Sequence, residues 1–419
     1  FPNRTPHTGA KCMQAVYRPI RASYISTNRY VLTNTDYFRD SSWLDISWEY
    51  VVNGVAGETG EVKSVIPPKG KTEVVLKHKS IDTTKDCCIN FIYKDKSTGK
   101  IVAKEQILMC QSVGRRAIEG GAGEVAYIEN STMISIATNN ASVAIDKETG
   151  RLTGYEVDGV EYLNRNAKNK GFSLSLYDSP IDNYMYVSNK WKALGLDSAK
   201  CVFTGLDSEK QSGKVVVACH YDVLLKGKKK FVYTIQYTVC ADNTLDVKLL
   251  LDTKKYVDLP KFGVCLEMPS CYDGVRYYGK GDKENYSDFG AHALLGIYET
   301  TVGKMAEPYI RPQASGNRAE TRWAEVFDEN GTGLRFTAQG TAFNFNAVPY
   351  NPEGLIGATH RQEIKYDGTT CVHIDHFVRG VGSNSCGPDT RSEYRLGKKQ
   401  TRLQYEFTVR PIGKSESRK

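Results

Sequence analysis

Long apolar runs are missing from this sequence of 419 residues. No run reaches the roughly 18 residues that a membrane-spanning helix needs, so we expect no membrane partner. An excess of one charge is also missing, because 56 basic and 48 acidic residues give a net charge of only +8. The basic clusters are short, Arg115 with Arg116 and Lys228 to Lys230, and carry none of the interleaved aromatics of a nucleic-acid platform. We therefore expect no nucleic-acid partner.

Cysteine pairs spaced for metal or redox chemistry are missing as well. The 11 cysteines are odd in number and contain no Cys-x-x-Cys, so we expect most of them to be buried apolar groups. Cys87 and Cys88 are adjacent and point to opposite faces of any strand, so at most one is expected in the core. His373, Asp375 and His376 lie within four residues, but strand alternation places His376 on the other face. We predict no metal site and no cofactor in this chain.

Sustained helical periodicity is missing too. Its absence excludes a (β/α)₈ barrel, a module of about 250 residues with a helix after every strand. The 26 tyrosines and 37 glycines favour sheets and tight turns, and short alternating runs bounded by turn residues recur along the chain. A helical turn or two is expected only within residues 285–299. The sequence therefore predicts an all-β fold.

A glycine-rich stretch, residues 115–124, divides the chain into two segments and is typical of a linker. The first segment fits a small immunoglobulin-like β-sandwich of about 100 residues. The second fits one large antiparallel sandwich. The predicted boundaries are an N-terminal extension over 1–8, a sandwich over 9–114, a linker over 115–123, a large domain over 124–412 and a tail over 413–419. Because the chain opens at Phe1 without methionine, we expect it to be a piece of a longer polypeptide.

Three stretches carry a pattern more specific than β-rich composition: residues 277–323, 358–364 and 377–396. Together they resemble a signature in the C-terminal domain of the family 2 β-galactosidases. SLYDSPIDNYMY and NKWKALGLD resemble two further elements of that domain, and PHTGAKCMQAVYRPI resembles the beginning of the sandwich that follows the family's barrel. The sequence departs from the family at Tyr184, where a further Asp is frequent, and at Ser179, where Ala is frequent.

The resemblance implies a supersandwich similar to the galactose mutarotase superfamily. It also implies an enzyme that hydrolyses terminal non-reducing β-D-galactose residues with retention, through a glycosyl-enzyme intermediate. The family's two catalytic glutamates lie in the barrel, so no catalytic residue is expected in this chain. We expect the fragment alone to be inactive and to contribute an active-site wall and subunit contacts.

One loop is implied to reach the sugar. In the family, a loop similar to residues 380–388 presents a tryptophan or a cysteine to the bound substrate, and Cys386 occupies that position here. Its neighbours Asn384, Ser385 and Gly387 are included in the predicted substrate-binding set. From the residues alone, the same segment also fits an ordinary connection between strands.

Further polar residues cluster in the family-like stretches and are candidates for sugar contact: Asp182, Asn183, Glu284, Arg311, Arg318, Arg322 and His360. Their spacing fits a sugar-binding cleft, a buried ion-pair network or a contact with a neighbouring domain equally well. His360 with Glu284 is also the acid–base pair to test for epimerase chemistry.

The expected partners are a β-galactoside, the catalytic barrel of the same enzyme or of a partner subunit, and further copies of the chain in a homo-oligomer. A divalent cation would belong to the missing barrel. The alternative function is a stand-alone carbohydrate-binding module or a small interaction subunit. The resemblance is to bacterial enzymes and leaves the compartment, cytoplasm or periplasm, open.

Overall fold

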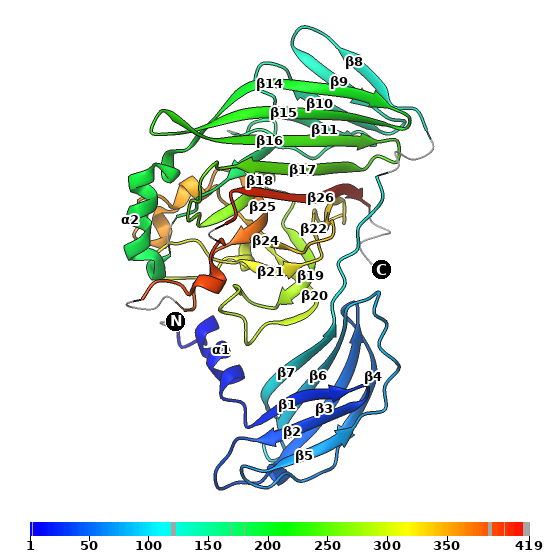
Figure 1. Cartoon of the computed structure of the whole chain (residues 1–419), viewed down its shortest axis with the longest axis vertical. Helices are drawn as coiled ribbons and strands as arrows, with labels where there is room; N and C mark the ends of the chain where they lie inside the picture. The colour runs from blue at the N-terminus through cyan, green and yellow to red at the C-terminus, as the bar shows by residue number, and fades with distance from the viewer. Residues whose placement is uncertain are drawn as a thin grey trace. The chain divides into compact units, whose positions relative to one another are not determined.

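A computed structural model describes residues 1, 3–118, 123–167, 169–179, 181–383, 388–397 and 399–413 (Figure 1). The chain divides into two compact units. The N-terminal unit contains residues 1–113 and two later segments, 278–283 and 290–298, and the C-terminal unit contains the remainder. The domain boundaries given above stay predictions.

The N-terminal unit is a β-sandwich of two antiparallel sheets preceded by helix α1 (Thr8–Val16). One sheet has the order β1 (Ile20–Ser26), β2 (Arg29–Asn34), β5 (Lys71–Val75). The other has the order β4 (Val55–Val62), β3 (Leu44–Val52), β6 (Cys87–Asp95), β7 (Ile101–Cys110). The alternation of β3 places Ile46, Trp48 and Tyr50 in a core with the side chains of the facing sheet.

Both cysteines of the adjacent pair are buried, with Cys87 0% and Cys88 2% exposed. Only Cys87 belongs to the described core cluster, so Cys88 is covered on the opposite face of β6.

Part of this unit's packing comes from far along the chain. The Gln106 side chain donates to the Leu295 carbonyl at 3.0 Å and accepts from the Leu295 amide at 2.8 Å, so it forms the same pair of hydrogen bonds as a neighbouring strand would.

Three further antiparallel sheets consist mainly of residues of the C-terminal unit; in the largest of them, residues 278–281 and 294–298 are counted with the N-terminal unit. The first has the order β12 (Val160–Glu161), β11 (Leu152–Val157), β10 (Ala141–Asp146), β9 (Met133–Ala137), β8 (Ala126–Glu129). The largest has the order β14 (Lys200–Gln211), β15 (Lys214–Leu225), β16 (Lys228–Cys240), β17 (Leu245–Asp252), β26 (Arg402–Ile412), β23 (Gly333–Ala338), β22 (Trp323–Phe327), β19 (Gly274–Gly281), β20 (Leu294–Thr301). The third has the order β13 (Phe172–Ser175), β18 (Lys261–Pro269), β25 (Thr369–Val378), β24 (Phe343–Val348), β21 (Arg318–Thr321).

The third sheet forms the interior of the C-terminal unit. Strand β15 alternates between buried and half-buried residues, as a strand with one covered face does. Strand β18 is instead buried at eight of its nine positions and β25 at its first seven, so both faces of their sheet are covered there (Figure 1). The all-β prediction is confirmed, with a small sandwich and a large, several-sheet antiparallel assembly.

Helices are few in the described ranges. They are α1, α2 (Met185–Leu194) and α3 (Val302–Met305), with 3₁₀ turns η1 (Ser41–Trp43), η2 (Asp182–Tyr184), η3 (Leu196–Ser198), η4 (Pro352–Leu355), η5 (Arg361–Glu363) and η6 (Ser392–Tyr394). The helical turn expected within residues 285–299 is wrong: turns and a single bridge between Tyr286 and Phe289 lead into β20. The end of this segment forms strand β20, which pairs with β19 at the edge of the largest sheet, and this pairing takes the place of a helical turn. Within the described part of the chain, no helix is long and apolar enough to cross a membrane.

Candidate functional site

The loop singled out by the sequence is described at its two ends. Asn384, Ser385, Cys386 and Gly387 themselves lie outside the described residues. The residues just before and just after them, 379–383 and 388–395, form a compact polar base in the C-terminal unit. We call these two segments the loop base.

Asp288 fixes the first segment of the loop base. Its carboxylate accepts hydrogen bonds from the Val381 amide at 2.6 Å, the Ser383 amide at 2.8 Å and the Ser383 hydroxyl at 2.7 Å. The Ser383 hydroxyl oxygen also accepts from the Arg391 amide at 3.1 Å, which ties the first segment to the second. One carboxylate thus satisfies two backbone donors, which would otherwise cost free energy if they were left unpaired.

Two glycines allow Asp288 to approach this closely. A Cβ at Gly380 would lie 2.6 Å from the Asp288 carboxyl carbon, and one at Gly382 would lie 2.6 Å from the Asp288 carbonyl oxygen. These distances are shorter than non-bonded carbon and oxygen atoms tolerate. The two glycines of the Gly-Val-Gly sequence are therefore required by packing.

Arg379 joins the second segment to the core. Its side chain is fully buried, and its guanidinium bonds to Asp258 and, at 2.6 Å, to Asp389. Asp389 also accepts from Arg395 at 3.0 Å. The Arg379 guanidinium lies 5.5 Å from the ring centre of Trp191 on α2. The loop base is thus held by a charged network as well as by backbone hydrogen bonds.

Asn183 and Tyr184 contact the loop base from η2. The Asn183 amide donates to the Val381 carbonyl at 2.7 Å, and the Tyr184 hydroxyl donates to the Arg379 carbonyl at 2.7 Å. Burial raises the pKa of Tyr184 well above its usual value, so its hydroxyl stays protonated as a donor. The sequence marked Tyr184 only as a departure from the family pattern, and the structure shows its hydroxyl bonded to the backbone of the loop base.

The other predicted polar residues divide into exposed and buried groups. Asp182 and Arg311 are brought together at 3.3 Å on the surface. Glu284 is buried, accepts from the Tyr309 hydroxyl and from the Gly316 amide at 3.0 Å, and has its pKa raised by burial.

The predicted arginines and histidine also have partners. Arg318 is buried and donates to the Tyr277 hydroxyl at 3.0 Å. Arg322 is buried and donates to the Glu320 carbonyl at 2.6 Å. His360 is exposed and bonds to Glu363 at 3.2 Å within the cap of η5. These contacts place Glu284, Arg318 and Arg322 in buried networks and His360 in a local surface turn.

A buried ionic cluster that sequence reasoning missed lies on the third sheet. The Lys261 ammonium bonds to Asp178 at 2.8 Å and to Asp375 at 2.9 Å, and lies 3.4 Å from Nδ1 of His373. Strand pairing brings these residues together, because Cys265 on β18 faces His373 on β25 and Gly263 faces Asp375. The signal available in the sequence was only the alternation of His373 and Asp375. Both residues were weighed, with His376, as metal ligands.

Two carboxylates share the single ammonium of Lys261 in this cluster, and their pKa values shift in opposite directions. Burial raises the pKa of Asp178, but the charge of Lys261 and its hydrogen bond outweigh burial and hold that pKa below the usual value. Burial raises the pKa of Asp375 to about 7. Burial, followed by the charge of Lys261, lowers the pKa of His373 to about 3. His373 is therefore a neutral imidazole near pH 7.

A disulfide joins Cys265 and Cys371 beside this cluster. Among the residues that the structure describes, the sulfur atoms and a ring nitrogen of His373 lie within 4.8 Å of one another, which is a spacing that metal ligands can have. The two sulfurs are bonded to each other, however, and metals bind thiolates. The Lys261 ammonium beside His373 adds a positive charge that disfavours a cation. The arrangement described is a cross-strand disulfide.

Comparisons with known proteins match most of the chain. Residues 137–409 match the family model "Beta galactosidase small chain", and residues 30–112 match "Beta-galactosidase, domain 4". A β-galactosidase of Actinobacillus pleuropneumoniae is 24% identical over 97% of this chain and 40% of its own length. A β-galactosidase of Streptococcus thermophilus is 30% identical over 68% of this chain and 27% of its own length.

The chain spans about two fifths of the length of the curated relatives that it matches from end to end. Among solved structures, a candidate mutarotase, YeaD of Salmonella typhimurium, aligns over 72% of this chain and 96% of its own. The TM-score is 0.39 and the identity 9%.

Proposed function

We propose, because this chain belongs to the β-galactosidase small-chain family, that it forms the C-terminal, non-barrel part of a β-galactosidase. The complete enzyme would hydrolyse terminal non-reducing β-D-galactose residues with retention, using two glutamates of a barrel that this chain does not contain. The partner would be that barrel, in the same polypeptide or in another subunit. This chain would supply one wall of the sugar pocket.

The loop base is the observation that supports this role most directly. Residues that reach into another domain's active site need a rigid support, because a displacement of about 1 Å in a positioning group can cost about 100-fold in rate. Asp288, Arg379, Asn183 and Tyr184 all fix the ends of the loop that contains Cys386. A cysteine offers less area for stacking on a sugar than an indole, so we infer a weaker apolar platform at this position.

Hydrolysis of a chromogenic β-galactoside tests whether the catalytic residues lie outside this chain. The purified chain is expected to leave the substrate intact. The longer polypeptide encoded by the complete reading frame is expected to hydrolyse it, because only that polypeptide would carry the two glutamates. Turnover by the chain alone, abolished by a single substitution within it, would contradict the proposal. A complete reading frame without a barrel would favour the alternative, a carbohydrate-binding or interaction module.

Replacing Asp288 by alanine tests the loop base. In the isolated chain, the Val381 and Ser383 amides should exchange their hydrogens at least about 10-fold faster, because each loses its acceptor. In the complete enzyme, kcat/KM should fall about 10-fold with little change in the unfolding midpoint, because the loop is displaced and the core is untouched. Hydrogen exchange followed by mass spectrometry or NMR, together with galactoside kinetics, measures both effects.

Asp207→Ala is the matched control for this variant. Its side chain is 87% exposed, and within the described ranges it bonds to the partly exposed His220. This control should leave both exchange and kinetics at their wild-type values. Wild-type kinetics in an Asp288→Ala enzyme whose loop amides exchange faster would show that the loop base does not serve the sugar pocket.

A further inference from the structure

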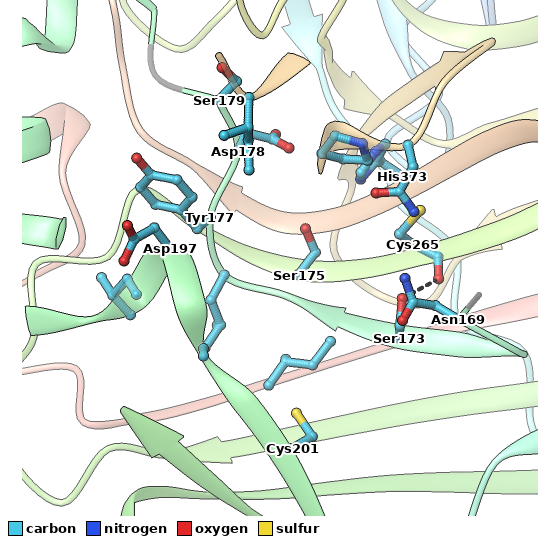
Figure 2. A pocket seen from close by; sticks show the side chains of 17 residues that line it. Asn169, Ser173, Ser175, Tyr177, Asp178, Ser179, Asp197, Cys201, Cys265 and His373 are labelled. Atoms are coloured by element: carbon cyan, nitrogen blue, oxygen red, sulfur yellow. Dashed lines mark hydrogen bonds between the residues drawn. The ribbon is translucent and has the colours of Figure 1, made fainter. Parts of the chain in front are cut away.

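A cavity of about 170 Å³ lies beside the buried ionic cluster of the C-terminal unit (Figure 2). Its walls come from β13 and the residues on both sides of it, from η3 and the start of β14, from the segment after β24, and from β18 and β25. Asp197, one of the lining residues, is exposed, so the cavity reaches the surface there. Pockets that hold drug-sized ligands have volumes of roughly 300–1,000 Å³. This cavity is therefore the size for a single small molecule.

The polar groups of the cavity wall are held in place from behind. Glu267 is 3% exposed, and one of its carboxylate oxygens accepts from the side-chain amides of Asn169 at 3.3 Å and Asn351 at 2.8 Å. Both asparagines line the cavity. A buried carboxylate that fixes two amides from distant parts of the chain makes this wall a preorganised surface.

One group in the cavity wall, the Tyr177 hydroxyl, lacks a hydrogen-bond partner in the described structure. This hydroxyl is buried. Buried hydroxyls in folded proteins nearly always have a partner. Figure 2 shows Tyr177 next to Asp178 and Asp197 in the cavity wall. A ligand hydroxyl at this position would complete the hydrogen bonding of Tyr177.

The charges around the cavity favour a neutral ligand. Asp178 lines it as an acceptor, but its charge is compensated by Lys261 at 2.8 Å. His373 also lines it and is neutral near pH 7. An anion would meet Asp178 and Asp197, whereas a cation would meet the field of the buried Lys261. Carboxylate, amide, imidazole and hydroxyl groups together offer both donors and acceptors, as a polyhydroxylated ligand requires.

We propose that this cavity binds one neutral hexose, with Tyr177 and Asp178 as direct hydrogen-bonding partners and Glu267 as a positioning residue behind the two amides. The inference goes beyond the proposed function. It concerns a site built only from this chain, and it holds whether or not the chain works with a barrel.

Titration of the 419-residue chain with D-galactose, D-glucose and, as an anionic comparison, D-glucuronate tests the proposal by calorimetry or NMR. We expect saturable binding of at least one neutral hexose and weaker binding of glucuronate. Tyr177→Phe should weaken binding about 5-fold through loss of one neutral hydrogen bond, and Asp178→Asn at least about 10-fold through loss of a charged acceptor. Tyr186→Phe is the matched control, because Tyr186 is 65% exposed and should leave the affinity unchanged.

Asp178→Asn also disturbs the pairing of Lys261, so its fold must be confirmed by circular dichroism. Tyr177→Phe removes a hydroxyl that has no partner in the described structure and keeps the test valid if the first variant unfolds. Absence of saturable binding by the folded wild type, or equal affinities for wild type and Tyr177→Phe, would overturn the proposal. The measurement does not involve galactoside hydrolysis. Its failure would therefore leave the proposed function intact, and an inactive complete enzyme would leave this inference intact.

Discussion

Arg379→Met is expected to lower the free energy of unfolding of the C-terminal unit by about 3 kcal/mol, since removing one partner of a buried ion pair costs about 3–5 kcal/mol. The lower end applies here. Asp258 and Asp389, the two acceptors, retain 30% and 35% side-chain exposure and can be hydrated when the guanidinium is gone. Methionine fills most of the space of the arginine stem, so the loss is mainly electrostatic. Urea unfolding followed by tryptophan fluorescence would report it, because Trp191 lies next to Arg379.

Arg402→Met is the matched control for this prediction. Arg402 bonds to Asp252 at 3.2 Å but is 85% exposed, and exposed pairs contribute about 0–1 kcal/mol. The two substitutions remove the same chemical group from the same unit and differ in burial. Equal shifts of the urea midpoint in the two variants would show that burial of the Arg379 network does not stabilise the fold.

Asp375→Asn and His373→Gln are expected to change the pH dependence of stability in opposite directions. The pKa of Asp375 is raised from 3.8 to about 7 in the folded chain, so its stabilising contribution is complete below about pH 4 and is lost as the pH rises through 7. The pKa of His373 is lowered from 6.5 to about 3, so its contribution is complete above pH 6.5 and is lost as the pH falls through 3. In the wild type the two trends oppose each other.

Each substitution removes one of the two trends. Relative to wild type, Asp375→Asn should gain stability between pH 4 and 7, and His373→Gln should lose stability over nearly the same interval. One pKa unit corresponds to about 1.4 kcal/mol, so each relative change is at most about 4–5 kcal/mol. Urea unfolding at several pH values between 4 and 7 measures both curves. Parallel curves for the two variants and wild type would contradict the assigned protonation states.

Exposed residues of the same types serve as controls. Asp182 and His360 have side chains that are 57% and 62% exposed. Asp182→Asn should therefore change the free energy of unfolding by no more than about 1 kcal/mol, because exposed ion pairs contribute little. His360→Gln is a weaker control, because His360 also bonds to Glu363 in the cap of η5.

Secondary structure was most predictable where alternation and turn residues coincided. Asn53-Gly54 marked the hairpin between β3 and β4, and both residues have positive φ, as the tight two-residue hairpin turn requires. The helix α2 was missed although its signal was present. Tyr184, Val187, Ser188 and Trp191 follow helical spacing and are buried, and Gly195 ends the helix at φ 90°. A ten-residue helix among many strands gave too short a pattern to outweigh the β-rich context.

The candidate loop could be named from the sequence and its role stays a prediction, but the residues that hold its two ends could not be predicted. Resemblance to the family singled out the loop that contains Cys386, whereas nothing local pointed to Asp288, which is 93 residues before Val381 in the sequence. The Lys261 cluster was equally hidden. Lys261 is 112 residues from His373, and they meet only because β18 and β25 pair in one register.

The sequence by itself determined the β-rich class of this protein and its family likeness. Alternation, turn residues and short motifs involve only neighbouring residues, so they can be recognised without knowing how the strands pack. The tertiary structure alone decided which polar residues share a site. Glu284, Arg318 and Lys261 are ordinary charged residues in the sequence, and burial among residues from distant segments gives them their hydrogen bonds and ion pairs. The physical reason is that desolvation and charge pairing depend on spatial neighbours, which strand register fixes and residue order does not display.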